Sequence, residues 1–236
     1  LAALGVINFL FGFLYAALWR DPRSEVALRA EREAARAEAR EPLNVWGLLP
    51  VSCATAIYLI GQMVLITYVP LYLKEVMQFS PYWASQALAL TQAGAMVGRV
   101  GWGVASDRFF GGRRKIVLMI IGVISALSIG ALGLIRAGSS YFALFLLLFV
   151  AGLCIVGYQG VSYALIGEIA GQARTGAGLG MMITINSAAA TVGTPLFGHI
   201  VDRTGSYAVG WQVLAATICV GILGLAILLK EPKRGP

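Results

Sequence analysis

Long uncharged stretches alternate with short charged segments along the whole of this 236-residue chain. About 20 residues of α-helix cross a hydrocarbon layer about 30 Å thick, and each uncharged stretch is about that long or longer. The stretches are continuously apolar, whereas the shorter tilted strands of an outer-membrane barrel alternate apolar and polar residues. The pattern therefore predicts seven membrane-spanning helices, at residues 1–19, 46–73, 82–106, 116–135, 141–167, 175–201 and 207–229.

Polar residues inside the predicted spans are concentrated in four of the seven. They lie on one helical face or cluster together: Thr55, Tyr58 and Gln62 in the second span; Ser85, Gln92 and Arg99 in the third; Tyr158, Gln159, Ser162 and Tyr163 in the fifth; Thr184, Asn186, Ser187, Thr191 and Thr194 in the sixth. Polar groups in hydrocarbon need a partner in the protein or in water, so we expect these four helices to surround an aqueous pocket. Hydrogen bonding between helices is the alternative for the Ser and Thr stripes. The fourth and seventh spans carry few polar residues, and we expect them to face lipid all round.

Composition and charge give these spans a direction. Hydrophobic residues make up 58% of the chain and charged residues 12%, which is about half the charged share of an ordinary soluble domain. If the first span runs inward, fourteen of the 18 Lys and Arg lie in cytosolic connections and the tail, three (Lys74, Arg136 and Arg203) lie outside, and Arg99 lies within a span. Lys and Arg favour the cytoplasmic side. We therefore expect a multi-pass protein of the inner (plasma) membrane, in contact with lipid, whose net charge of +7 reflects topology and predicts no nucleic-acid partner.

The sequence divides into four predicted parts: residues 1–19 as the last helix of an N-terminal half, 20–45 as a cytosolic connector helix, 46–229 as a six-helix transmembrane domain, and 230–236 as a cytosolic tail. The connector is rich in Ala, Arg and Glu, which favour helix. Arg29, Arg32, Arg36 and Arg40 align on one of its faces, either towards anionic lipid headgroups or towards solvent. The chain begins with Leu inside an apolar run without the features of a signal peptide, so we expect it to be part of a longer protein.

A loop motif follows the third predicted span: GVASDRFFGGRRK, at residues 103–115. This sequence resembles the Gly-x3-Asp-Arg-x-x-Gly-x-Arg-Arg loop motif of the major facilitator superfamily, and TPLFGHIVDRTGSY at residues 194–207 resembles the end of the eleventh helix in many members. The resemblance implies an all-α transmembrane fold: the six-helix C-terminal bundle of a twelve-helix transporter, plus the helix before it. The implied gating residues are Gly103, Asp107, Arg108, Gly112, Arg113 and Arg114.

Asp107 is the centre of that expected gate. We expect it to pair with Arg108 and Arg113, and to cap the N-terminus of the helix that opens at Thr175. The resemblance implies that this cluster stabilises the outward-facing state and breaks when the cytosolic side opens. The alternative is that the three cations at residues 113–115 only enforce topology.

Arg99 is the main candidate for contact with substrate. It lies eight residues before Asp107, which places it about 12 Å along the helix and near the middle of the membrane. An Arg there costs about 2.5–3.5 kcal/mol unless it faces a cavity or a partner. No Asp or Glu lies mid-span in this chain, so its partner is a carboxylate-type substrate, an acid in the missing half, or neighbouring carbonyls.

Two further resemblances point to organic anions. The spacing Arg-x3-Gly-x3-Asp-Arg from Arg99 is similar to the eighth helix of nitrate/nitrite porters, oxalate/formate antiporters and monocarboxylate transporters. FLYAALWRDPRSE, at residues 13–25, resembles the same region of anion:cation symporters. The candidate substrate-binding residues are Arg99, Gln62, Tyr58, Gln92, Tyr158, Gln159 and Asn186.

We therefore predict a secondary active transporter that moves a small organic anion by alternating access, as a symporter or antiporter coupled to a proton or a counter-anion. The functional unit would need the missing N-terminal half. The alternative is an efflux pump of the same superfamily, in which Tyr58, Tyr158 and Tyr163 stack on cations. A receptor that does not transport is a third reading.

Enzymatic chemistry has little support in the sequence. GQARTGAG, at residues 171–178, lacks the Lys-Ser/Thr ending of a phosphate-binding loop, and no nucleophile stands with a base or a metal cluster. Cys53, Cys154 and Cys219 are isolated in apolar stretches, where we expect small buried side chains. We predict no enzyme activity, no cofactor and no metal.

Overall fold

The computed structural model describes residues 9, 12–14, 42–135 and 139–229. It divides the chain into two units, residues 1–41 and 42–236. The predictions for the connector and the tail, and most of the predicted first span, lie outside the described residues. The second unit is described below.

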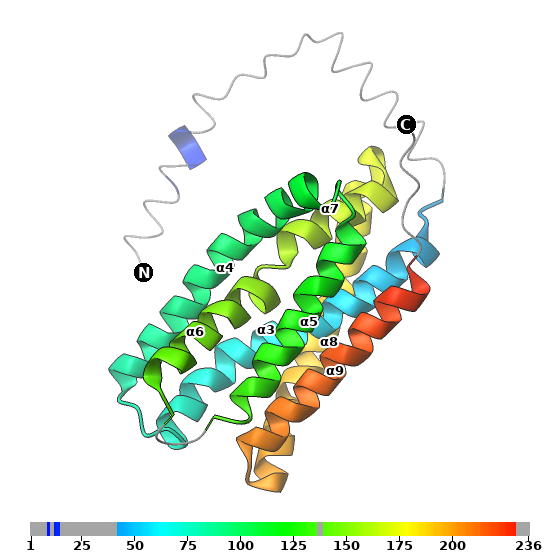
Figure 1. Cartoon of the computed structure of the whole chain (residues 1–236). Helices are drawn as coiled ribbons and strands as arrows, with labels where there is room; N and C mark the ends of the chain where they lie inside the picture. Colours follow the sequence, from blue (N-terminus) through cyan, green and yellow to red (C-terminus); the bar gives the residue numbers. More distant parts are fainter. Residues whose placement is uncertain (1–8, 10–11, 15–41, 136–138, 230–236) are drawn as a thin grey trace. The chain divides into compact units, whose positions relative to one another are not determined.

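The second unit is a bundle of helices that cross it from end to end (Figure 1). Its elements are α3 (Val45–Glu75), α4 (Pro81–Phe109), α5 (Arg114–Leu132), α6 (Tyr141–Ala151), a π-helical turn (Gly152–Val156), α7 (Gln159–Ala170), a 3-10 turn (Gln172–Arg174), α8 (Thr175–Thr204) and α9 (Tyr207–Leu228). The all-α prediction is confirmed. The six predicted spans from residue 46 onward agree with these helices to within three residues at each boundary.

Four of the described crossings are long and apolar enough to span a membrane: Val45–Glu75, Arg114–Leu132, Tyr141–Ala170 and Tyr207–Leu228. The other two long helices, α4 with 29 residues and α8 with 30, have sufficient length. Their lower hydropathy reflects polar and small residues along one side. Helices α4 and α8 are therefore more polar than the other long helices.

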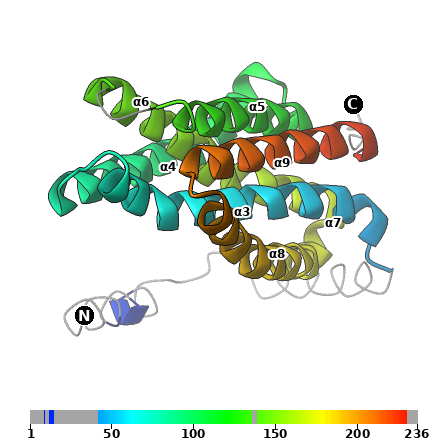
Figure 2. The same ribbon diagram turned by 90° about the horizontal axis from the view of Figure 1, so that it is seen from below.

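Helix α3 lies at the centre of the unit. It contacts α4, α7, α8 and α9, and Figure 2 shows it between α8 and α9. Its two prolines, Pro50 and Pro70, lie near its ends, so the middle of the helix is free of them. Many of the side chains in the middle of α3, among them Tyr58, Gln62 and Leu65, are buried.

Small residues bring α4 close to the helix formed by α6 and α7. A Cβ atom on Gly98 would collide with the Leu153 carbonyl, and one on Gly152 would collide with the Thr91 carbonyl. Gly94 faces the Phe149 carbonyl in the same way. Close backbone approach through glycine is a common way to pack helices in membranes, because dispersion contacts replace the hydrophobic effect there.

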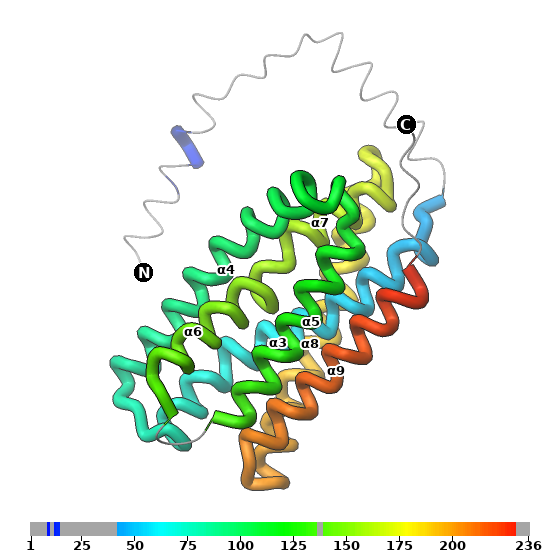
Figure 3. The backbone as a smooth tube through the Cα atoms, viewed as in Figure 1, coloured from blue at the N-terminus to red at the C-terminus, as the bar shows by residue number. Residues whose placement is uncertain are grey.

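The path from α6 to α7 is interrupted by the π-helical turn (Figure 3). The Leu153 carbonyl, inside this turn, accepts a hydrogen bond of 2.9 Å from the indole Nε1 of Trp102 on α4. A break of this kind frees backbone groups that need other partners in a membrane. Trp102 therefore supplies a partner at the discontinuity.

Helices α5 and α9 do not face lipid all round, contrary to the prediction. They pack on one another, and each buries a face that includes Val117 and Ile121 on α5 and Trp211 and Ile218 on α9. Lys115 Nζ donates to the Ala226 and Leu229 carbonyls, at 2.9 and 2.6 Å. A cation at the C-terminus of a helix satisfies its last carbonyls and its dipole.

The prediction for the cysteines is wrong for two of the three. Cys154 is buried, as expected, whereas Cys53 and Cys219 are exposed on the surface of the bundle. In a membrane an exposed thiol can face lipid or another part of the protein at little cost, because apolar surface is not confined to the interior. The apolar residues next to each cysteine in the sequence therefore do not tell whether its side chain is buried.

Gly98→Ala is expected to destabilise the protein by about 1–3 kcal/mol, because the added methyl group forces α4 away from the Leu153 carbonyl. The measurement is the thermal unfolding midpoint of the purified protein in detergent. Gly101→Ala is the matched control, since a Cβ there meets nothing within 4 Å. Equal midpoints for the two variants would show that close packing at Gly98 does not hold these helices together.

Candidate functional site

The polar residues of the spans separate into an exposed set and a buried set. The exposed set lies on α4 and α8: Ser85, Gln92 and Arg99, and Thr184, Ser187 and Thr191. The buried set lies between helices and includes Thr55, Tyr58, Tyr158 and Asn186. The sequence pattern predicts that both sets surround one pocket. In the structure one set is exposed on α4 and α8, and the other is buried between helices.

The hydroxyl groups on the exposed surface are largely satisfied by their own helices. Thr184 Oγ1 donates to the Gly180 carbonyl, and Thr191 Oγ1 donates to the Ser187 carbonyl. Within the part of the chain that the structure describes, no residue forms a hydrogen bond or an ion pair with the side chain of Gln92 or Arg99. Gln92 and Arg99 are therefore among the side chains on this surface whose polar atoms can take an outside partner.

Arg99 lies ten residues from the end of α4 at Phe109, or about 15 Å along the helix. Its backbone is fixed by α7, because Gly160 packs directly on the Arg99 carbonyl. This contact places Gln159, which is half-buried, and Tyr163, which is 40% exposed, beside the part of α4 that carries Arg99. A mid-helix arginine thus lies on an exposed part of α4 whose backbone packs on α7 near two uncharged polar residues.

Tyr58, Tyr158 and Asn186 are all at most 5% exposed. The Tyr58 hydroxyl donates to the Leu118 carbonyl at 2.9 Å, and the Tyr158 hydroxyl donates to the Thr55 carbonyl at 3.4 Å. The two rings meet edge to face, with centroids 5.3 Å apart. Thr55 Oγ1 donates to Asn186 Oδ1 at 3.2 Å. In this structure these groups join α3 to α5, α7 and α8 and do not line an open surface.

Gln62 differs from the other buried candidates. Its side chain is 6% exposed, and its Oε1 atom has no hydrogen-bond partner among the described residues. A buried amide oxygen without a partner is costly and is often satisfied by water or a ligand. Gln62 is therefore the one of the buried substrate-binding candidates in the described part of the chain that has an atom open to another partner.

The motif loop is a tight turn that depends on its two glycines. Gly111 and Gly112 have φ angles of +54° and +72°, in the region that favours glycine. The Gly112 amide donates to the Ser106 carbonyl at 2.7 Å, and the Arg113 amide donates to the Phe110 carbonyl at 3.0 Å. The turn places Arg114 at the first position of α5, beside the end of α4.

Arg114 is the cation that the structure joins to Asp107, with a distance of 3.7 Å between Nη2 and Oδ1. It also donates through Nε to Oε1 of Glu168 on α7, at 2.6 Å. The predicted pairs of Asp107 with Arg108 and Arg113 are wrong, since both arginines are exposed and Asp107 pairs instead with Arg114. The predicted cap on α8 is also not observed, because no described side chain caps that helix and Asp107 is 63% exposed.

Glu168 is the residue of this cluster that the sequence did not reveal as a partner. It lies seven residues before Thr175, and its position at the same membrane side as the motif was a usable signal. Two nearby bonds tie other helix ends together: Arg174 Nη1 donates to the Pro42 carbonyl, and Lys115 reaches the end of α9. We call Asp107, Arg114 and Glu168 the Arg114 junction.

Comparisons with known proteins identify a family. The sequence model of the Major Facilitator Superfamily matches residues 1–127 and 87–236. The structure of the E. coli fucose:proton symporter FucP has a TM-score of 0.65 at 16% identity, over 94% of this chain and 53% of that one. The structure of the proton:xylose symporter XylE, solved with 6-bromo-6-deoxy-D-glucose, has a TM-score of 0.54 at 20% identity. The match covers 78% of this chain and 45% of XylE. The chain therefore spans about half the length of both structures, and the likeness shows the fold. No curated protein sequence matches.

A double-mutant cycle with Arg114→Ala and Glu168→Ala should give a coupling free energy of about 1 kcal/mol, because the pair is close and Arg114 is largely buried. The shift of the thermal unfolding midpoint is the measurement. A parallel cycle with Arg113→Ala and Glu168→Ala is the control, and its coupling should be near zero. Equal coupling in both cycles would contradict the assignment of Arg114 as the partner of Glu168.

Proposed function

Since the chain belongs to the major facilitator superfamily, we propose that it forms one half of a secondary active transporter that works by alternating access. The six helices of the second unit would pack against a second half, and the substrate would bind between the two, as is general for transporters built from repeats. The membrane would be the inner (plasma) membrane, with the Arg114 junction on the cytoplasmic side. The asymmetry of Lys and Arg supports that orientation.

The proposed substrate is a small organic anion, and the position of Arg99 carries this proposal. A guanidinium in the middle of a membrane helix is tolerated where it meets water, a counter-ion or a ligand. Arg99 is exposed, and no described carboxylate neutralises it. Its planar set of donors matches a carboxylate, with which it can form two parallel hydrogen bonds.

Neighbouring amides would complete the anion site. Gln92 lies two helical turns from Arg99 on the same exposed face of α4, and Gln159 precedes Gly160, the residue of α7 that packs on the Arg99 backbone. Both side chains can donate to the remaining oxygens of the anion. Gln62 would join them only if the helices open, since it is buried here. Tyr58, Tyr158 and Asn186 would support the site from behind.

The Arg114 junction would act as the cytosolic latch. It joins the ends of α4, α5 and α7 through one arginine and two carboxylates. Motion of α4 or α7 would break these pairs, so the junction favours the arrangement in which the three ends stay together. The energy source would be a coupled proton or a counter-anion.

Two other substrate classes remain as rivals. Neutral sugars, for which the two structurally similar symporters are named, would use the amides of Gln92 and Gln159 but would not need Arg99. An efflux pump for cations would need open tyrosine faces, but Tyr58 and Tyr158 are buried. Tyr163 is 40% exposed, but it lies on α7 near Arg99, which would repel a cation. Anion transport gives a role to the exposed charge of Arg99, which neither rival requires.

Arg99→Gln is expected to lower kcat/KM for a carboxylate substrate by about 10- to 100-fold, because it removes a charge-assisted hydrogen bond of about 1.5–3 kcal/mol. The measurement is uptake of labelled lactate, oxalate, fucose and xylose into proteoliposomes that contain the complete transporter. Arg203→Gln is the matched control, since Arg203 is an exposed arginine in the last turn of α8 and belongs to neither the proposed substrate site nor the gating motif.

Arg99→Lys should keep part of the activity, because the charge remains and the planar pair of donors is lost. Uptake of a sugar but of no carboxylate would contradict the anion proposal. So would carboxylate uptake that is equal in the wild type and Arg99→Gln.

A further inference from the structure

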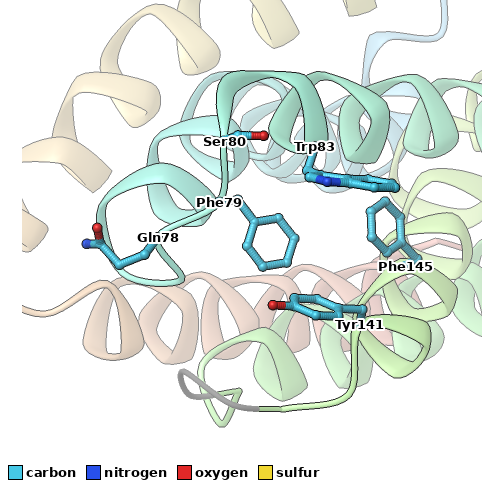
Figure 4. Close-up of a pocket in the computed structure, with 6 residues that line it drawn as sticks. All are labelled: Gln78, Phe79, Ser80, Trp83, Tyr141 and Phe145. Atoms are coloured by element: carbon cyan, nitrogen blue, oxygen red, sulfur yellow. The ribbon is translucent and has the colours of Figure 1, made fainter.

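An aromatic pocket lies at the opposite end of the bundle from the Arg114 junction. It has a volume of about 450 Å³ and lies between the turn that joins α3 to α4 and the start of α6. Its lining residues are Gln78, Phe79, Ser80, Trp83, Tyr141 and Phe145 (Figure 4). The size falls within the range of small-molecule sites. None of the residues proposed above for substrate binding lines this pocket.

Four aromatic rings from three segments surround this space. Phe79 comes from the turn, Trp83 from the first turn of α4, and Tyr141 and Phe145 from α6 (Figure 4). Phe79 and Tyr141 meet at 5.0 Å between ring centroids and 62° between planes, and Trp83 and Phe145 meet at 6.3 Å and 71°. In such edge-to-face pairs the edge of one ring meets the face of the other, so each pair leaves one ring whose faces are not covered by its partner.

The frame of the pocket is fixed by the backbone. Gln78 has a φ angle of +55°, and its Nε2 atom donates to the Glu75 carbonyl at 2.7 Å. The Phe79 amide donates to the Leu73 carbonyl at 2.9 Å, and the Phe79 side chain is 9% exposed. Trp83 and Tyr141 are more than half exposed, so the pocket combines a fixed floor with an accessible mouth.

The chemistry of the lining selects the class of ligand. All of its apolar residues are aromatic, its polar residues are an amide and a hydroxyl, and no described charged residue lines it. A groove of the same volume between α3 and α9 is lined mainly by aliphatic residues such as Leu49, Ile57 and Val220, which suit an alkyl chain. Aromatic faces carry a negative potential that attracts cations, and a box of several rings is the common arrangement around methylated ammonium groups.

We propose that this aromatic pocket binds a small quaternary ammonium ion from the aqueous phase through cation–π contacts. Arg99 would repel such a cation, so the two sites take ligands of opposite charge. Binding at this pocket therefore does not depend on anion transport, and either can be wrong without the other. The competing explanation is that the rings are only the aromatic belt of a membrane protein at the lipid interface.

The test is the binding of choline, compared with its neutral isostere 3,3-dimethylbutan-1-ol, to the purified full-length protein in a detergent without choline headgroups. Isothermal titration calorimetry gives both affinities. Choline is expected to bind at least about tenfold more tightly, because the two probes have the same shape and differ in charge. Equal affinities, or no saturable binding of choline, would overturn the proposal and leave the aromatic belt as the explanation.

Variants of the pocket residues test whether choline binds at these aromatic rings. Trp83→Leu and Tyr141→Leu should each weaken choline binding by about 3- to 30-fold. Trp46→Leu removes an exposed tryptophan that does not line this pocket, and it should leave choline binding unchanged. Gel filtration checks that each variant is folded. Unchanged affinity in both ring variants would overturn the proposal, as would an equal loss in Trp46→Leu.

Discussion

The absence of water in the hydrocarbon layer is the constraint on which this structure depends. Each polar group within a span must find a partner in the protein or face a water-filled space. Several polar side chains of the spans meet this constraint in one of two ways, whereas the buried Gln62 Oε1 atom has no partner among the described residues. Tyr58, Tyr158 and Thr55 bond to groups on neighbouring helices, whereas Gln92 and Arg99 lie on an exposed face without a described partner. The first group holds the bundle together, and the second is available for binding.

Packing and function are linked through the helix that contains the π-helical turn. Glycines bring this helix against α4, and Gly160 fixes the Arg99 backbone. The same helix carries Glu168 of the Arg114 junction at its far end. A movement of α7 relative to α4 would therefore alter the surroundings of Arg99 and the distances within the junction together. That connection is a physical route by which an anion site could affect a cytosolic latch.

Much of the fold followed from the sequence, because apolar length determines which segments cross a membrane and glycine pairs mark tight turns. The side chains that face one another were harder to predict. Arg113 and Arg114 are adjacent in the sequence, and the turn at Gly111 and Gly112, which sets where α5 begins, leaves Arg114 as the one that reaches Asp107. Tyr58 and Arg99 both occupy polar stripes, but the rotation of each helix, set by its contacts, buries one and exposes the other.

The central claim is that the face of α4 with Gln92 and Arg99 meets water. The most direct measurement is the labelling of Arg99→Cys by a membrane-impermeant thiol reagent, in the complete protein with Cys53, Cys154 and Cys219 replaced by alanine. Leu127→Cys, on an exposed apolar position of α5, is the lipid-facing control. The account predicts rapid labelling at position 99 and slow labelling at position 127. Labelling at position 99 as slow as at position 127 would contradict it.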